Sequence, residues 1–326
     1  MRGRAVSWFC ALVLAVAMLP AGAPSAQPSD TTSTPAAIAA PSPNAVSPPK
    51  VGGYLQARET WMKGVGLTAT LNRARVSVDG ALPARFSYRF LVEFEAVSGT
   101  TGLVSLRDAL AKWTYGPFAL TAGQFKTPFT REFIMSITQV ETAERAAVVD
   151  ALAPKRDIGV MGEAAWGPDA ALQLGVFNGE GQNVAVNRDS SVLVVGRATA
   201  RPFAQLQIGA AVAAYASDST RFGYEGTLEE RGALLRAEWI EQRRDVGGRD
   251  RGWYALAGWR VVPWCQLVAR REDLKPPLAS RRNRATTAGV NFDLAPNRVR
   301  LLANWVTRRI GAVRRETWIT QLQLRF

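Results

Sequence analysis

The chain ends with the stretch RRETWITQLQLRF, residues 314–326, in which apolar and polar side chains alternate. One alternate set is mostly apolar and the other mostly polar: Trp318, Thr320, Leu322, Leu324 and Phe326 against Ile319, Gln321, Gln323 and Arg325. Because successive side chains of a strand project to opposite faces, this stretch predicts a strand with one apolar and one polar face. A half-buried strand of a soluble sheet alternates in the same way, so the interpretation depends on the rest of the chain.

The N-terminal residues predict export. Arg2 and Arg4 precede an apolar run over 8–19, and small residues follow it up to Ala26. This order is typical of a secretory signal peptide, which we assign to residues 1–26. A membrane anchor is disfavoured, because the run is too short to cross about 30 Å of hydrocarbon. Cys10 lies inside the run and would leave with it.

The mature chain divides into a short lead-in and one large domain. Residues 27–50 are rich in Pro, Ser, Ala and Thr, which predicts a disordered periplasmic segment. Residues 51–326 contain short alternating segments and no apolar run of about eighteen residues, so helical membrane spans are excluded. Cys265 is the only cysteine there, so no intrachain disulfide can form. We predict an all-β fold, a transmembrane antiparallel β-barrel, which satisfies every backbone group in lipid.

The connections between segments alternate between tight and longer ones. The tight ones, mostly marked by Pro or Gly, lie at 79–83, 115–117, 166–168, 201–202, 230–232, 262–263 and 295–297. The longer ones lie at 62–66, 98–102, 127–155, 179–190, 216–220, 243–249, 273–283 and 309–313. Together they predict sixteen strands, with both chain ends on the periplasmic side. The segment 219–229 is the least regular strand, and the even count depends on it.

Segment 84–96 illustrates the two faces of the predicted barrel. Phe86, Phe90 and Phe94 alternate with Arg85, Arg89 and Glu93. Apolar residues would face lipid and charged residues a watery lumen, and aromatic residues near strand ends suit the interfacial girdles of such barrels. A soluble β-sandwich or lipocalin-like barrel would instead turn its apolar face inward, and alternation alone does not distinguish the two.

Several short motifs, taken in order, resemble one family. They are LNRAR at 71–75, LRDA at 106–109, GQFKTPF at 123–129, VFNGEG at 176–181, GVNF at 289–292, NRVR at 297–300 and NW at 304–305. Over residues 52–326 the chain is similar to the phosphate-selective porins O and P of Gram-negative outer membranes. The resemblance implies a sixteen-stranded, trimeric, anion-preferring channel with phosphate or polyphosphate as its solute. The lysine-rich constriction of that family has no counterpart here, because the mature chain has few lysines.

The charge of the chain agrees with passage of anions. It has 40 Lys plus Arg against 27 Asp plus Glu, and only Arg2 and Arg4 leave with the signal peptide. A basic pore concentrates anions, and the planar guanidinium group can donate two hydrogen bonds to phosphate. The alternation predicts a lumen ladder, with the following basic residues as anion-binding candidates: Arg58, Arg73, Arg75, Arg89, Lys112, Lys126, Arg197, Arg236, Arg260, Arg270, Arg298 and Arg300. The resemblance supports Arg73 and Arg75 most directly, and Arg58 more loosely.

These arginines have a second interpretation. They could pair with acidic residues such as Glu93, Asp108 and Glu238 to keep a polar wall satisfied, which would give a general diffusion pore of low selectivity. Arginines in the longer connections and near them, such as Arg284, Arg309 and Arg314, would instead lie on the outer rim, where they could bind anionic lipid headgroups, lipopolysaccharide included.

The connection at 127–155 is too long for a hairpin, and loops of this size are usually functional. We predict that it folds into the lumen, with a helix over 143–153 capped by Thr142. Its charged residues Arg131, Glu132, Arg145 and Lys155 would then set the constriction. An outward-facing, exposed loop is the alternative.

Other classes of protein receive little support. The chain has no histidine, which removes Ser-His catalysis and the commonest metal ligand, so no enzyme, metal or cofactor is expected. The basic residues are spread over all segments, so nucleic acid is not expected as a partner. The expected partners are inorganic phosphate or other small anions, outer-membrane lipid and two further copies of the chain. A non-conducting barrel for interaction or anchoring remains the alternative from another class.

Overall fold

The computed structural model describes residues 46–95, 103–216, 219–276 and 281–326. The predicted signal peptide 1–26 and the predicted connection at 98–102 lie outside the described residues, as does most of the lead-in 27–50. Among the described residues, no helix is long and apolar enough to cross a membrane.

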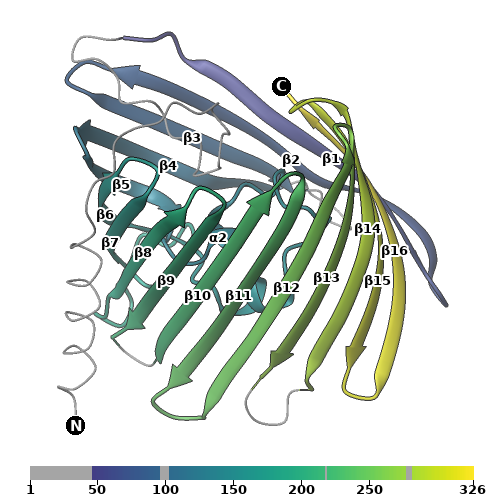
Figure 1. Cartoon of the computed structure of the whole chain (residues 1–326). Coiled ribbons are helices and arrows are strands. Elements are labelled where there is room, and N and C mark those ends of the chain that lie inside the picture. The colour runs from purple at the N-terminus through teal and green to yellow at the C-terminus, as the bar shows by residue number, and fades with distance from the viewer. Residues whose placement is uncertain (1–45, 96–102, 217–218, 277–280) are drawn as a thin grey trace. The chain divides into compact units, whose positions relative to one another are not determined.

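The described residues form a closed barrel of sixteen strands, in which each strand pairs with its sequence neighbours and β16 pairs with β1. Figure 1 shows the strands in chain order from purple β1 to yellow β16. They are β1 (Lys50–Met62), β2 (Gly66–Leu82), β3 (Phe86–Glu95), β4 (Leu103–Tyr115), β5 (Phe118–Lys126), β6 (Arg156–Trp166), β7 (Ala170–Phe177), β8 (Leu193–Phe203), β9 (Leu206–Tyr215), β10 (Ser219–Glu230), β11 (Ala233–Arg244), β12 (Arg249–Val262), β13 (Cys265–Lys275), β14 (Asn283–Ala295), β15 (Val299–Ile310) and β16 (Val313–Arg325). The predicted architecture is therefore confirmed, including the irregular strand β10.

The barrel has a short-turn end and a long-loop end. β1 begins and β16 ends at the short-turn end, where the Gly53 N–H donates to the Phe326 carbonyl at 3.0 Å and the Gly53 carbonyl accepts from the Phe326 N–H at 3.1 Å. The first tight turn lies later than predicted, because β2 continues to Leu82 and Ala84 and Arg85 adopt positive φ angles of 58° and 67°. Asp79 is a strand residue because its carboxylate faces Arg89 across the β2–β3 pair, at 2.9 Å.

The two faces of the sheet are as predicted for a membrane barrel. On β3, Phe86, Phe90 and Phe94 are exposed on the outer surface, whereas Ser87 and Glu93 are buried on the inner one. On β16, Trp318, Leu322 and Leu324 are exposed outside, whereas Gln321 and Gln323 are buried inside. A soluble barrel would have the reverse arrangement, so this polarity identifies the outer surface as the lipid-facing one.

Two β-bulges interrupt the alternation next to each other in the wall. One shifts the β1–β2 register at Gln56 and Ala57, so that Asn72 is the extra residue on β2. The other shifts the β3–β4 register at Leu91 and Val92, so that Arg107 is the extra residue on β4. A bulge places two residues of one strand opposite one residue of its partner. Two consecutive side chains can therefore turn into the lumen at each point.

The connection between β5 and β6 folds into the barrel, as predicted. It contains two short helices, α2 (Arg131–Ile134) and α3 (Ala147–Leu152), and Figure 1 shows α2 inside the ring of strands. Phe129, Val148 and Leu152 are buried with Val195 and Ile240 of the inner wall in one apolar cluster. We call residues 127–155 the inner loop.

Small residues in the wall make room for the inner loop. A Cβ atom at Gly223 on β10 would lie 2.7 Å from Thr130, and one at Gly252 on β12 would lie 2.8 Å from Val148. Contacts this short are not tolerated, so only glycine lets the loop approach the wall this closely at these two positions. The loop is therefore packed against the β8–β13 side of the barrel.

The prediction of a helix over 143–153 placed the start of the helix too early. α3 begins at Ala147 after the N-cap residue Ala146, which makes no side-chain cap. The Thr142 hydroxyl donates instead to the Glu144 carbonyl at 2.7 Å. Glu144 itself pairs with Arg58 on β1. Contacts with the wall thus hold residues 142–146 in a non-helical conformation, against the helix propensity of their alanines.

Candidate functional site

The inner loop is fixed to the wall through its backbone. The N–H of Glu132 donates to Glu238 Oε1 at 2.6 Å, that of Ala143 to Asn304 Oδ1 at 2.7 Å, and that of Ala147 to Glu272 Oε2 at 3.0 Å. These acceptors come from β11, β15 and β13 respectively. Because the loop satisfies its backbone groups with wall side chains from several strands, it has one defined position in the lumen.

Two of the predicted lumen arginines that hold the loop are almost fully buried. Arg236 binds both carboxylate oxygens of Glu141, at 2.6 and 3.1 Å. Arg270 donates to Thr142 Oγ1 at 2.6 Å and to the Glu144 carbonyl at 2.8 Å. Their side chains are only 3% exposed. Arg236 and Arg270 are therefore covered by the loop and do not face open water.

Lys126, at the end of β5, also binds the inner loop. Its Nζ donates to the carbonyl oxygens of Phe133, Ile134 and Met135, at 2.9, 2.9 and 2.7 Å. Arg145 of the loop donates to the carbonyls of Glu132 and Met135, both at 2.9 Å. Cations suit this position because the last carbonyls of a helix are unpaired and carry partial negative charge.

Burial alters the acid–base properties of the loop residues. It raises the pKa of Glu132 to about 7, although Arg270 and Arg145 act in the opposite direction. It lowers the pKa values of the Arg131 and Arg145 guanidinium groups, and it lowers that of Lys155 although Asp150 opposes the shift. Charged forms are disfavoured away from water, which explains the direction of each shift.

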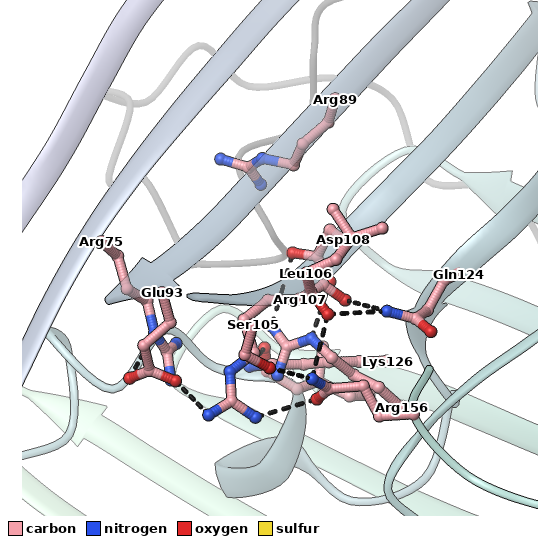
Figure 2. Close-up of polar contacts among 12 residues, drawn as sticks. Arg75, Arg89, Glu93, Ser105, Leu106, Arg107, Asp108, Gln124, Lys126 and Arg156 are labelled. Carbon is pink, nitrogen blue, oxygen red and sulfur yellow. Dashed lines mark hydrogen bonds and ion pairs between the residues drawn. The ribbon is translucent and has the colours of Figure 1, made fainter. Parts of the chain in front are cut away.

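A group of basic side chains lies on the inner wall of β2 to β6, and Figure 2 shows most of it. We call it the basic cluster, and it consists of Arg73, Arg75, Arg89, Arg107, Lys126 and Arg156. Three carboxylates lie among these cations, one of which is Asp79, the partner of Arg89. Glu93 bonds Arg75 at 3.0 and 3.1 Å and also pairs with Arg107, and Asp108 accepts from Arg156 Nε at 2.7 Å. Arg145 of the inner loop adds its positive charge to the fields of Arg73 and Arg156.

Several members of the basic cluster remain open to the lumen. The side chains of Arg89 and Arg107 are 24% and 23% exposed, and that of Lys112, further along β4, is 25% exposed. Arg73 is half-buried, and its Nη1 donates to the amide oxygen of Gln56 at 3.1 Å. In this part of the wall the basic side chains outnumber the carboxylates, so the surface facing the lumen is positive.

The bulge on β4 accounts for Arg107, which is absent from the predicted ladder. Strict alternation places Asp108 and Lys112 inside and Arg107 outside. Because the extra residue lies at Arg107, both Arg107 and Asp108 turn inward. Arg156, at the start of β6, was missed because it directly follows the long loop and has no alternating segment before it.

Two cavities lie on either side of the loop segment 138–144. The one at the short-turn end has a volume of about 770 Å³ and is lined by Arg260, Arg298, Arg300 and Arg325, with Glu141 and Asp293. The one at the long-loop end has a volume of about 450 Å³ and is lined by Arg270, Arg281, Arg308 and Arg315, with Glu144. Both cavities are therefore predominantly basic, like the cluster on the β2–β6 wall.

The remaining predicted residues are spread along the lumen. Arg58 pairs with Glu144, Arg197 with Glu225, and Lys112 lies 3.5 Å from Glu163. At the short-turn end, Arg260 binds Asp293 at 2.8 Å and Arg300 donates to the Val140 carbonyl at 3.2 Å. Arg298 lies in the turn between β14 and β15 rather than within a strand. The structure thus gathers Arg73, Arg75, Arg89 and Lys126 in the basic cluster and Arg260, Arg298 and Arg300 around the short-turn cavity, and it separates the others.

In the inner loop, Arg131 and Glu132 are packed against the wall. The Arg131 N–H donates to Glu225 Oε2 at 2.6 Å, and its guanidinium contacts Gln207 of β9. Glu132 is 3.5 Å from Arg270. Lys155 donates to the Asp150 carbonyl. Of the four predicted constriction residues, Arg145 is the one whose charge acts on the basic cluster.

Comparison with known proteins agrees with this architecture. No curated protein matches the chain. Among solved structures, the anion-selective porin from Comamonas acidovorans is similar with a TM-score of 0.65 and 11% identity, over 86% of this chain and 99% of that chain. OmpT of Vibrio cholerae in its trimer form gives 0.64 and 12%, over 86% and 99%. A mutant of the Rh. blastica porin gives 0.58 and 12%, over 86% and 100%. At these identities the likeness concerns the fold.

The family comparison is more specific. The model of the phosphate-selective porin O and P family matches residues 62–237, which is more than half of the chain. The match includes the inner loop and β2 to β6, where the basic cluster lies. The chain therefore belongs to the phosphate-selective porin O and P family and is an outer-membrane porin.

Proposed function

We propose that this porin is an anion-preferring diffusion channel for phosphate and other small anions. The observation that carries the proposal is the basic cluster on β2 to β6, in which Arg89 and Arg107 are about a quarter exposed to the lumen and the cations outnumber the carboxylates. A positive surface in a narrow, low-dielectric channel raises the local concentration of anions and repels cations.

The proposed path uses weak sites in succession. An anion would meet Arg308 and Arg315 in the cavity at the long-loop end, then the basic cluster, then Arg298 and Arg300 at the short-turn end. Conduction needs binding that is strong enough to attract the ion and weak enough to release it. Arginines that already share a carboxylate meet this condition, because their charge is partly neutralised. Arg236 takes no part in the path, since it is buried under the inner loop, and Arg270 borders the long-loop cavity with a side chain that is only 3% exposed.

Phosphate is the favoured solute on two grounds. The family to which the chain belongs is described as phosphate-selective. The lumen cations are mainly arginines, whose fork matches two phosphate oxygens better than the compact charge of lysine does. We further propose a homotrimer, since OmpT of Vibrio cholerae is recorded in a trimer form. We also propose that the chain is exported with cleavage of residues 1–26. The outer surface of the barrel would then contact lipopolysaccharide.

The test is ion selectivity in a planar phosphatidylcholine bilayer. The wild type should give a reversal potential of anion-selective sign in a salt gradient, and phosphate should reduce chloride conductance in a saturable way. The double variant Arg73→Gln/Arg107→Gln should lower the anion-to-cation permeability ratio by about twofold or more, because it removes two cations from the basic cluster. In this variant, a higher phosphate concentration should be needed to reduce the chloride conductance by half.

A matched control removes the same charge from the outer surface. Arg251 on β12 and Arg271 on β13 are exposed and outward-facing, so Arg251→Gln/Arg271→Gln should leave selectivity unchanged. Equal ratios in the wild type and the lumen variant would overturn the proposal.

A general diffusion pore of low selectivity is the second candidate. The ion pairs Arg75–Glu93, Arg156–Asp108 and Arg197–Glu225 favour it, because each neutralises a lumen arginine. It predicts a permeability ratio near one and no saturation by phosphate.

A further inference from the structure

One arc of the outer surface carries a row of arginines. Arg284 on β14 is directly opposite Arg309 on β15, and Arg309 is directly opposite Arg314 on β16. Directly paired residues of adjacent strands share a face. Trp318, which is exposed on the outer surface, is four residues from Arg314 on the same strand, so the row faces outward. We call these three residues the outer arginine row.

The row lies at the level expected for lipid headgroups. Trp305 and Trp318 pair across β15 and β16, with ring centroids 6.2 Å apart, and belong to the aromatic girdle. Arg309 and Arg314 lie four residues nearer the long-loop end, about 13 Å along the strand and about 9 Å in height for strands tilted by about 45°. Because the girdle marks the boundary of the hydrocarbon, the arginines are placed among the headgroups of the outer leaflet.

The row is an unfavourable arrangement without an anion. Like charges directly opposite each other in a sheet repel and destabilise it. Two carboxylates border the row, but both already have a partner: Glu316 pairs with Arg314 at 2.8 Å, and Asp273, directly opposite Arg284 on β13, pairs with Arg282 outside the row. Arg309 has no carboxylate opposite it on either neighbouring strand. The Nε atom of Arg284 is buried and has no hydrogen-bond partner among the residues that the structure describes. A negatively charged group from outside the chain would therefore complete the site.

The basic surface is confined to one side of the barrel. Neighbouring outward positions on β12 and β13 add Arg251 and Arg271. At the same end of β2, β4 and β8, the outward residues Leu67, Val104 and Val194 are apolar and exposed. General adhesion to an anionic surface does not explain such an asymmetry, whereas a defined ligand on one arc does.

We propose that the outer arginine row is a docking site for a phosphorylated glycolipid of the outer leaflet, with its phosphates on Arg284, Arg309 and Arg314 and its acyl chains on the aromatic and aliphatic surface below. Neighbouring strands are about 4.8 Å apart, so the three Cα atoms span about 10 Å, enough to contact more than one phosphate of a single headgroup. Guanidinium groups form strong paired hydrogen bonds to phosphate oxygens without a bridging metal ion. The inference rests on the proposed function only in placing the long-loop end in the outer leaflet.

The experiment titrates the full folded chain, in neutral detergent, with purified diphosphoryl lipid A and follows co-migration and the unfolding temperature. The wild type should bind, and the triple variant Arg284→Gln/Arg309→Gln/Arg314→Gln should bind about tenfold more weakly or less. Binding should persist in EDTA. It should weaken for lipid A stripped of phosphate, and inorganic phosphate at millimolar concentration should not replace it.

The matched control Arg85→Gln/Arg201→Gln/Arg231→Gln removes the same charge at the opposite end, outside the proposed anion path, and should bind like the wild type. The triple variant Arg284→Lys/Arg309→Lys/Arg314→Lys, which keeps the charge, should recover part of the affinity. Equal binding in all variants would overturn the proposal, as would equal losses in the outer-row and control variants, which would indicate net charge alone. Conductance of the outer-row variant in phosphatidylcholine bilayers verifies folding, so this test fails or succeeds independently of anion selectivity.

Discussion

Single residues decide where the inner loop lies. Lys126 closes β5, and its ammonium group donates to three successive carbonyls at the end of α2. The sequence indicates that Lys126 is a basic residue near the loop, but it does not distinguish a cation that meets the solute from one that anchors the backbone. That difference depends on the direction of the chain after Thr127, which alternation does not determine.

We predict that Lys126→Met frees the first part of the loop. The substitution keeps an unbranched side chain but leaves the Phe133 and Ile134 carbonyls without this donor and Met135 with Arg145 alone, at a cost of about 1–3 kcal/mol in loop stability. Single-channel recordings should show a larger mean conductance with more frequent transitions than in the wild type. Lys63→Met, which replaces an exposed lysine between β1 and β2, should leave the recordings unchanged. Unaltered conductance in Lys126→Met would show that the loop does not need this contact.

At the scale of elements, the inner loop combines a successful prediction with a failed one. Its length, 127–155, was enough to predict that it enters the lumen, because a segment of that size is rarely left without contacts. Its helix was misplaced, because residues 142–146 make contacts with Arg58, Arg270 and Asn304 that no local pattern reveals. Tertiary contacts outweighed the helix propensity of the alanines.

The loop should also respond to pH through Glu132. Burial raises the pKa of Glu132 to about 7 in the docked loop, whereas a released loop would expose it with an ordinary pKa. The docked state then holds the proton more tightly, so docking is strongest at low pH and weakens as the pH rises to about 7, by on the order of 3 kcal/mol. Arg270, Arg145 and Arg236 face the carboxylate and limit the loss, whereas Glu238 and Tyr254 increase it.

Recordings between pH 5 and pH 8 test this prediction. The wild type should show steadier conductance at pH 5 than at pH 8. Glu132→Gln, which is neutral at every pH, should remain steady across the range. A wild type that becomes noisier on acidification would contradict the assigned direction.

At the scale of the whole molecule, the barrel was predictable because membrane and water impose a two-residue period on every strand. The alternation within each strand predicts which side chains face lipid and which face the lumen. The sixteen strands and their polarity therefore follow from local patterns. The basic cluster was predictable only in part. Arg73, Arg75 and Arg89 obey the alternation, whereas Arg107 enters the lumen through a bulge that depends on the pairing of β3 with β4. The sequence shows that carboxylates such as Glu93 are present, but it does not show which arginines they pair with.

The distribution of charge over the whole lumen yields a last prediction. The proposed path places arginines in both cavities and in the basic cluster, so anion preference should arise from a shared field rather than from one tight site. Salt screens such a field, since the Debye length falls from about 10 Å at 0.1 M to about 3 Å at 1 M. The anion-to-cation permeability ratio from reversal potentials should therefore fall several-fold over this range. A ratio independent of salt would point instead to selection by direct contact at a single site, and the loss in Arg73→Gln/Arg107→Gln should then be complete rather than partial.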